Sequence, residues 1–282
     1  MQREFITTYS QWRQAASAGV WGGLHDIARK AALCGLSLFS SPLKSSGWLR
    51  FPYYHHVFDD ERRGFEQQLR RMRDWGDFVS LDDAINIIKD KQPLSQRLFC
   101  LTFDDGFRNC LTNALPILKE LDCPAAFFIP TGLTGLDPKP HRDQLMRFYR
   151  HAQYPGPVEL MNWDDCHIML AAGMTLGSHT VSHARLASLD ESSALDELTR
   201  SKEVIERELG ITCQHFACPW GIPDVHFRTN RDPWLAAQAG YCSFLTGARG
   251  LNRPGDNPLH IRRDHLLANW SDYQLRYFMR GA

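Results

Sequence analysis

The chain contains 282 residues, 43% of them hydrophobic, so it is long enough to bury one large core, and we expect one main domain. Its 32 lysines and arginines equal its 32 aspartates and glutamates, which leaves no overall basic field to hold a nucleic-acid backbone, so we expect no nucleic-acid partner. The eight cysteines show no paired spacing, which favours a reducing compartment.

The first 40 residues lack the charged start, apolar centre and small-residue cleavage site of a secretory signal. No later apolar run approaches the ~20 residues that are needed to cross a bilayer. We therefore expect a cytoplasmic protein without an integral membrane segment, and we leave peripheral membrane association open.

An N-terminal helical extension is expected before the main domain. Apolar residues recur every three or four positions over residues 10–40, which predicts helix, although Gly22 and Gly23 can divide it into two. Packing on the main domain is the commonest use of such an apolar stripe, with self-association and a membrane surface as alternatives. A loop rich in Ser, Pro and Gly follows, so we expect residues 1–47 to form the extension and its linker and residues 48–282 to form the main domain.

Apolar runs and amphipathic segments alternate along the main domain, which is the rhythm of an α/β fold. Residues 131–157, rich in Gly, Pro and charge, are longer than an ordinary connection and are expected as an insertion at the rim of a site. Strands are expected at residues 51–57, 77–80, 98–103, 125–129, 174–177, 215–218 and 259–266. Helices are expected around residues 65–72, 81–89, 111–121, 162–172 and 195–209.

One apolar run, from Leu98 to Phe103, stops abruptly at Asp104, Asp105 and Gly106. It predicts a buried strand that delivers two carboxylates to its carboxyl end, where α/β folds place their chemistry. Neighbouring residues on a strand point to opposite sides, and the glycine permits a turn, so we expect the two acids to have different roles. The alternative is an ordinary acidic turn.

Two histidines follow another expected strand. His179 and His183 are four residues apart, which on one face of a helical turn puts their Cβ atoms roughly 6 Å apart, close enough for both imidazoles to reach one metal ion. The alternative is a solvated surface pair. A third expected strand ends in Pro219, Trp220 and Gly221, so three strand ends present acids, imidazoles and an aromatic turn.

These three strand ends resemble, in order and spacing, motifs of the polysaccharide deacetylases of carbohydrate esterase family four, chitooligosaccharide deacetylases among them. The motifs are Thr102-Phe103-Asp104-Asp105-Gly106, Ser178-His179-Thr180-Val181-Ser182-His183 and Cys218-Pro219-Trp220-Gly221. The resemblance extends over residues 48–267 and implies a distorted (β/α) barrel of seven or eight strands. It implies that Asp105, His179 and His183 bind one divalent metal ion, usually zinc, and that Asp104 is the catalytic base.

The residue types also suit this chemistry by themselves. Two neutral imidazoles and one carboxylate leave a divalent ion with open positions for water and for a substrate oxygen. We expect Zn²⁺, with Co²⁺, Ni²⁺ or Mn²⁺ as alternatives. Such an ion makes water nucleophilic near neutral pH, and a carboxylate that does not bind it, Asp104, is then available as the general base.

Pro219 and Trp220 are expected to meet the substrate. The backbone N–H of Trp220 is placed to stabilise the oxyanion, and its ring to pack against the sugar or the acetyl methyl group. The alternative for this ring is an ordinary barrel aromatic.

The chain departs from the family at the third motif. Ala217 stands where well-known members have an arginine that orients the catalytic aspartate. Of the pair Arg262 and Arg263, we expect Arg263 to supply that guanidinium, because the late stretch resembles a strand ending in Arg in members with an Ala-x-Pro-aromatic-Gly motif. A surface salt bridge is the alternative.

The final family motif, a Leu-x-x-His that carries the general acid, is not clearly matched. By location, His265 is expected as this acid, with His260 as the other candidate and a structural histidine as the alternative for either. His55 ends a strand and is expected at the mouth of the site, and alternation along the strand leaves only one of His55 and His56 facing it.

The sequence therefore predicts a metal-dependent hydrolase, acting on carbon–nitrogen bonds other than peptide bonds, that removes N-acetyl groups from an amino sugar of a polysaccharide or its precursor. The expected location favours a lipid-linked or nucleotide-linked saccharide. An O-acetyl esterase acting on a saccharide is one alternative, and a catalytically degenerate carbohydrate-binding protein on the same fold is another. The sequence does not predict the oligomeric state.

Overall fold

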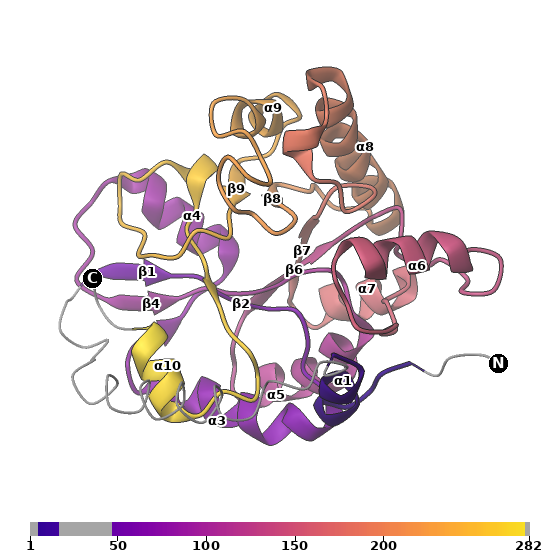
Figure 1. The fold of residues 1–282 in the computed structure, drawn as a ribbon. Helices are drawn as coiled ribbons and strands as arrows, with labels where there is room; N and C mark the ends of the chain where they lie inside the picture. Colours follow the sequence, from indigo (N-terminus) through magenta and orange to yellow (C-terminus); the bar gives the residue numbers. More distant parts are fainter. Residues whose placement is uncertain (1–4, 17–46, 280–282) are drawn as a thin grey trace.

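The computed structural model describes residues 5–16 and 47–279. Parallel strands form a curled sheet of seven strands, in the order β10-β2-β5-β6-β7-β8-β9, and a smaller sheet in the order β1-β4-β3 (Figure 1). The curled sheet comprises β2 (Pro52–Tyr54), β5 (Leu101–Phe103), β6 (Ala125–Ile129), β7 (Thr175–Ser178), β8 (His215–Ala217), β9 (Ser243–Leu245) and β10 (Asp264–His265). The smaller sheet comprises β1 (Trp48–Arg50), β3 (Asp77–Phe78) and β4 (Arg97–Phe99).

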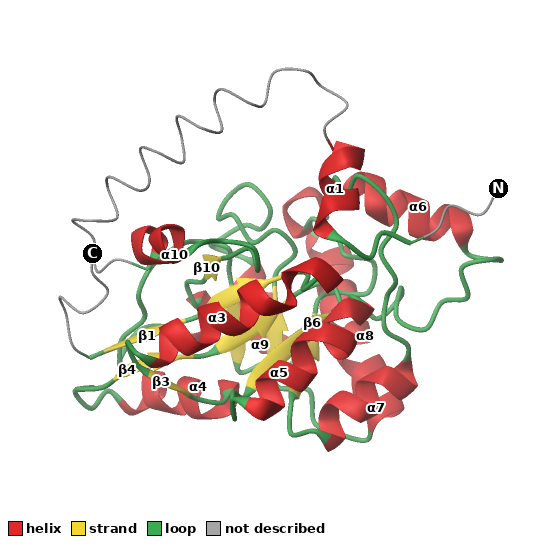
Figure 2. Ribbon diagram, turned by 90° about the horizontal axis from the view of Figure 1, so that it is seen from below, coloured by secondary structure: helices red, strands yellow, loops and turns green. Residues whose placement is uncertain are grey.

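Helices cover the outside of the strands, as α3, α4, α5 and α7 do in Figure 2. The α-helices are α1 (Tyr9–Ala16), α3 (Arg62–Arg73), α4 (Leu81–Asp90), α5 (Leu115–Glu120), α6 (Arg142–His151), α7 (Trp163–Ala171), α8 (Glu191–Leu209), α9 (Asp232–Gln238) and α10 (Asp272–Phe278). A π-helical stretch, η3 (Cys110–Ala114), precedes α5, and short 3-10 turns lie at η2 (Asp59–Glu61), η4 (Leu186–Ser188) and η5 (Pro258–His260). This α/β architecture confirms the predicted distorted (β/α) barrel.

Local sequence signals explain several of these helix ends. The Ser80 hydroxyl accepts a hydrogen bond from the Asp83 N–H at 3.2 Å and so caps the start of α4. Gly210 adopts a left-handed φ of 66° and ends α8. Of the helix predicted over residues 10–40, the part up to Ala16 is described, and the remainder lies outside the described residues.

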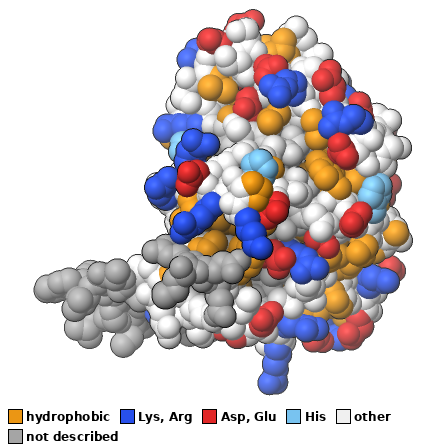
Figure 3. Space-filling view, turned by 90° about the vertical axis from the view of Figure 1, so that its right-hand side faces the viewer, with side chains coloured by type: hydrophobic (Ala, Val, Ile, Leu, Met, Phe, Trp, Pro, Cys, Tyr) orange, Lys and Arg blue, Asp and Glu red, His pale blue; other side chains and the backbone are white. Residues whose placement is uncertain are grey.

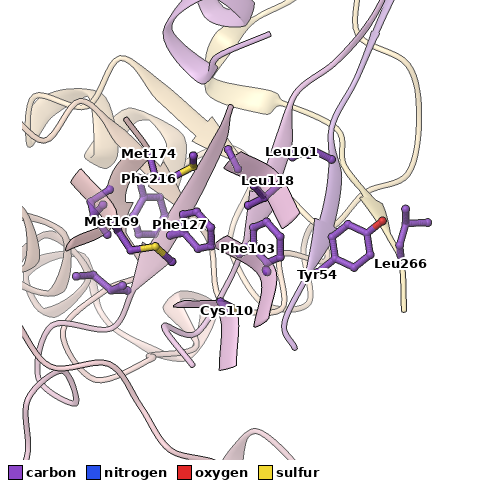
Figure 4. Packing of buried hydrophobic residues seen from close by; sticks show 14 of the residues in the cluster. Tyr54, Leu101, Phe103, Cys110, Leu118, Phe127, Met169, Met174, Phe216 and Leu266 are labelled. Carbon is purple, nitrogen blue, oxygen red and sulfur yellow. The ribbon is translucent and has the colours of Figure 1, made fainter. Parts of the chain in front are cut away.

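Stacked aromatic side chains fix the strands that carry the site. The rings of Phe103 and Phe127 stack with centroids 4.6 Å apart, and Tyr54 stacks on Phe103 at 5.5 Å (Figure 4). Phe65 of α3 meets Tyr54 edge-on at 5.2 Å. Each buried aromatic contributes about 2 kcal/mol from its removal from water, so β2, β5 and β6 are held in one fixed arrangement.

Residues 261–266, the closing segment, connect β9 at one edge of the curled sheet to β2 near the other. The Ile261 N–H donates to Phe244 O at 3.0 Å on the β9 side, and the Leu266 N–H donates to Tyr53 O at 2.9 Å on the β2 side. Arg263 lies between these two attachments, and its buried guanidinium reaches Thr246 and Asp104.

Several strand predictions were wrong in extent, and the strands predicted over residues 51–57 and 77–80 are regular only at β2 and β3. Residues 98–103 form two strands instead of one, because the Cys100 N–H donates to Arg50 O at 2.9 Å and the chain then passes from the smaller sheet to the curled one. Of the strand predicted over residues 259–266, only β10 is a regular strand. Its first part is a 3-10 turn, in which Asn257 caps the N–H of Leu259.

Basic and acidic side chains are interspersed on the face shown in Figure 3, with hydrophobic side chains exposed between them. Within the part of the chain that the structure describes, no helix combines the length and the apolarity that crossing a membrane requires.

Candidate active site

The carboxyl ends of the curled sheet converge on one pocket. Because parallel strands end at the same edge, side chains that follow β2, β5, β7 and β8 meet there. The pocket has a volume of about 300 Å³. Its lining includes His55, Asp105, His183, Trp220 and His265.

Backbone geometry separates the two consecutive acids. Asp105 and Gly106 both adopt left-handed φ values, 71° and 67°, immediately after β5. Gly106 fits closely, since a Cβ there would lie 3.1 Å from the Ile129 side chain. The turn thus begins one residue before the expected glycine, and it directs Asp104 and Asp105 to different partners.

Asp105 faces two imidazoles. Its Oδ1 lies 3.2 Å from His179 Nε2 and 3.0 Å from His183 Nε2, and all three residues are buried. Burial alone raises the pKa of Asp105, but the neighbouring His183 and His179 outweigh it and hold the pKa well below its usual range. The carboxylate is therefore ionised at neutral pH.

The same cluster fits a divalent cation. His179 Nδ1 lies 2.8 Å from Ala217 O, and since a carbonyl only accepts, Nδ1 carries a proton; in the neutral ring that binds a metal ion, Nε2 then presents a lone pair toward Asp105. Among the described residues no N–H or O–H is aligned to donate to Asp105 Oδ1, although this atom is buried. A buried carboxylate oxygen and two imidazole nitrogens without an aligned donor are a donor set suited to zinc and similar ions.

The helical turn predicted for the two histidines was wrong. Residues 179–183 form an irregular loop in which Thr180 and His183 have left-handed φ values of 65° and 58°. The loop, and not helical periodicity, brings the two Nε2 atoms to the same carboxylate oxygen.

Asp104 pairs with Arg263. The guanidinium donates to both carboxylate oxygens, from Nη1 to Oδ1 at 2.8 Å and from Nη2 to Oδ2 at 2.7 Å, and its Nε donates to Thr246 O at 2.8 Å. Burial raises the pKa of Asp104, but the Arg263 charge outweighs it and lowers the pKa below the usual value. Arg263 is 1% exposed, so this pair is not a surface salt bridge. Arg262 Nη1 instead lies 3.8 Å from Asp256 Oδ2, away from Asp104 and Asp105.

Two further histidines meet beside the pocket. His55 Nδ1 lies 3.2 Å from His265 Nε2, and His55 Nε2 lies 3.9 Å from Asp105 Oδ2. Burial, followed by the neighbouring His55, lowers the pKa of His265 to about 3. His265 is therefore a neutral ring at pH 7. His56 packs against the ring of Phe107, at 4.2 Å between centroids, and also lines the pocket, so the expectation that only one of the two neighbouring histidines faces the site was wrong.

Trp220 forms another wall of the pocket. It has a left-handed φ of 55°, and the Gly221 N–H donates a hydrogen bond to Pro219 O at 2.6 Å, which closes a tight turn around Trp220. Its ring meets His183 edge-on at 4.4 Å between centroids. His151, which the sequence does not mark as a site residue, meets this ring edge-on at 5.0 Å between centroids.

Residues 131–157 reach the rim of the site, as the sequence predicts, but the sequence did not indicate which residues of this insertion and of the N-terminal segment line the pocket. Tyr9 and Trp12 of the N-terminal segment line the pocket, and so does Tyr154, which follows α6. The Tyr154 hydroxyl donates to Asp105 Oδ2. Burial, and then the charge of Asp105, raise the pKa of Tyr154 well above its usual value, so its hydroxyl stays protonated. No motif marks this tyrosine, because its partner is 49 positions away.

Comparison with known proteins identifies the class. The family model described as "Polysaccharide deacetylase" matches residues 91–241, more than half of the chain, so the chain belongs to the polysaccharide deacetylase family. The family resemblance noted in the sequence is thereby confirmed.

Particular relatives are distant in sequence. The chain is 22% identical over 147 residues to "Putative polysaccharide deacetylase YxkH" of Bacillus subtilis (strain 168), covering 51% of this chain and 45% of the relative. The chain therefore matches less than half of that relative's length.

Solved structures share the fold across most of the chain. The structure of IcaB from Ammonifex degensii superposes with a TM-score of 0.68 at 24% identity, covering 83% of this chain and 97% of that one. The Streptococcus pyogenes deacetylase PplD in complex with acetate gives 0.67 at 22% identity, with coverages of 84% and 100%. The deacetylase domain of BpsB from Bordetella bronchiseptica gives 0.60 at 20% identity, with coverages of 80% and 97%.

Proposed function

We propose that this polysaccharide deacetylase hydrolyses the N-acetyl group of an amino sugar in a polysaccharide or its precursor. The observation that carries the proposal is the separation of the two consecutive acids. Asp105 lies with His179 and His183 in a cluster suited to one divalent ion, while Asp104 is held apart by Arg263. A cation site beside an independent carboxylate is the arrangement that metal-assisted hydrolysis requires.

Asp105, His179 and His183 would hold the ion, and Zn²⁺ is the proposed metal. When bound, a divalent ion supplies Lewis-acid activation of water and of the acetyl carbonyl. This chain's own residues then have to orient the amide, take the proton of the attacking water and protonate the departing nitrogen.

Asp104 is the proposed general base. Its two oxygens are fixed by Arg263, which keeps the carboxylate ionised before it accepts the proton of the attacking water. Water adds its oxygen to the acetyl carbon, the carbon–nitrogen bond breaks, acetate leaves, and the sugar keeps a free amine.

Further residues near the cluster would serve the substrate. We propose that the backbone N–H of Trp220 stabilises the oxyanion, and that Pro219, the Trp220 ring and His55 contact the sugar. His265 is the proposed source of the proton for the amine. Because its pKa is about 3, His265 starts as a neutral ring, so we propose that it receives a proton from solvent through the hydrogen-bonded and partly exposed His55 and passes it to the departing nitrogen.

The test is acetate release from matched saccharides. Purified protein supplied with zinc is incubated with an N-acetylglucosamine oligosaccharide and with an O-acetylated oligosaccharide of the same length. The proposal expects acetate and free amine from the first and little acetate from the second. Release from the O-acetyl substrate alone identifies an O-acetyl esterase. Saccharide binding without acetate from either identifies a carbohydrate-binding protein.

A further inference from the structure

Tyr154 reaches the site from the rim and not from a strand end. Helix α6 ends in a Schellman motif, in which Gln153 has a left-handed φ of 61° and the Tyr154 N–H donates to Tyr149 O at 2.7 Å. The Gln153 N–H completes the motif by donating to Arg150 O at 3.2 Å. This turn reverses the chain and directs the Tyr154 side chain back into the pocket.

Other aromatic rings surround the ring of Tyr154. Trp12 meets it edge-on at 5.3 Å and Phe107 at 5.2 Å between centroids, while His56 lies at 5.5 Å and Phe148 at 5.9 Å. Edge-to-face contacts of this kind restrict rotation of the ring. The hydroxyl is therefore kept at one place, against Asp105 Oδ2.

Trp12 belongs to a segment that is itself anchored. The Asp60 carboxylate accepts hydrogen bonds from the N–H groups of Tyr9 and Ser10, at 2.7 and 3.1 Å, and from the Ser10 hydroxyl at 2.9 Å. A carboxylate at the start of α1 satisfies N–H groups that have no partner within the helix. The segment that carries Trp12, one of the rings around Tyr154, is therefore attached to the barrel.

The two oxygens of Asp105 thus have different surroundings. Oδ1 faces the Nε2 atoms of His179 and His183, whereas Oδ2 faces the Tyr154 hydroxyl. Rotation about the bond to an aspartate carboxyl group is soft, so a carboxylate held at one oxygen keeps the other in a defined direction.

We propose that Tyr154 is a positioning residue for the metal site, which by holding Asp105 Oδ2 keeps Oδ1 directed at the cation. The inference rests on the proposed function, because it presupposes a cation at this cluster. A residue that hydrogen-bonds to a metal ligand without contacting the metal itself typically contributes 10–100-fold to metal affinity or to activity.

The experiment compares Tyr154→Phe with Tyr149→Phe. Each variant loses one hydroxyl, and the Tyr149 ring lies 6.4 Å from that of Tyr154, but the Tyr149 hydroxyl donates to Val158 O, away from the cluster. The affinity for Zn²⁺ is measured by competition with a chromogenic chelator at fixed pH. The absorption spectrum of the Co²⁺-loaded protein reports the coordination directly, and a thermal melt establishes that both variants fold.

The expected result is a zinc affinity about 10–100-fold weaker in Tyr154→Phe, with an altered cobalt spectrum, and an affinity close to wild type in Tyr149→Phe. Equal zinc affinity in Tyr154→Phe and wild type, or equal losses in both variants, overturns the inference.

The outcome also separates this inference from the proposed function. If Tyr154→Phe binds zinc more weakly than the wild type, but the wild type releases acetate from no acetylated saccharide, the positioning role is supported and the proposed activity is contradicted. A wild-type protein that takes up no divalent ion contradicts both.

Discussion

At the residue scale, Asp104 and Arg263 form a buried pair. We propose that Arg263 takes the place of the guanidinium that the third motif lacks at Ala217. The guanidinium also lies 4.3 Å from the Tyr53 ring centroid. Since a charge buried without a partner is costly, neither member of the pair can be removed alone without a penalty.

Replacing Arg263 with alanine should therefore destabilise the fold. Arg263→Ala leaves the Asp104 carboxylate buried and unpaired, and we expect the free energy of unfolding to fall by about 3–5 kcal/mol, with loss of acetate release. Chemical denaturation measures the change. The matched control is Arg200→Ala, because Arg200 pairs with Asp196 at 3.2 Å with side chains 62% and 56% exposed. This control should lose no more than about 0.5 kcal/mol, and similar losses in both variants would contradict the account.

Individual site residues differed in how far the sequence could indicate them. Asp104 and Asp105 were recognisable because they follow an apolar run directly, and His179 because it follows a second one. Tyr154 was not, because its contact with Asp105 depends on where α6 ends and on a left-handed turn at Gln153, a residue type that seldom signals one.

At the element scale, the loops after β8 and β9 are packed backbone to backbone. A Cβ on Gly221 would lie 2.3 Å from the N atom of Gly247, and the Gly247 N–H donates to Gly221 O at 2.8 Å. This contact supports the turn that carries Trp220. Only glycine fits, both for its φ of 64° and for the space.

Gly221→Ala should shift the Trp220 turn. We expect the free energy of unfolding to fall by about 2–4 kcal/mol, from backbone strain and the close contact together, and the KM for the acetylated saccharide to rise. The control is Gly210→Ala at the end of α8, where φ is 66° but no atom lies within 4 Å of the new Cβ. It should cost only about 1 kcal/mol and leave KM unchanged. If the two variants lose the same free energy of unfolding and have the same KM, the packed loops do not position Trp220.

Elements with a strong periodic signal were predicted well, and those set by distant contacts were not. The capped helix α4, the buried strand β6 and helix α8 follow from local patterns. The division of residues 98–103 into two strands follows from pairing with different partners, which a single apolar run does not reveal. Helix α6 lies in a segment whose glycines, prolines and charges predicted an insertion but gave no signal for its secondary structure.

At the scale of the whole molecule, the site draws on more of the chain than the family match covers. The match ends at residue 241, whereas Arg263 and His265 lie on the closing segment, and Trp12 and His55 come from before residue 91. The barrel brings these parts together because the closing segment bonds to both β9 and β2. The division into residues 1–47 and 48–282 stays a proposal, although Trp12 lines the pocket of the barrel.

The most direct measurement combines metal content with turnover in wild type and Asp104→Asn. We predict that purified wild-type protein carries about one divalent ion, loses acetate release in chelator and regains it when Zn²⁺ is added. Asp104→Asn should retain about one ion but release acetate roughly 100-fold more slowly or worse, because the base is lost while the ligands remain. Full activity of the wild type in chelator, or wild-type turnover by Asp104→Asn, would contradict the account.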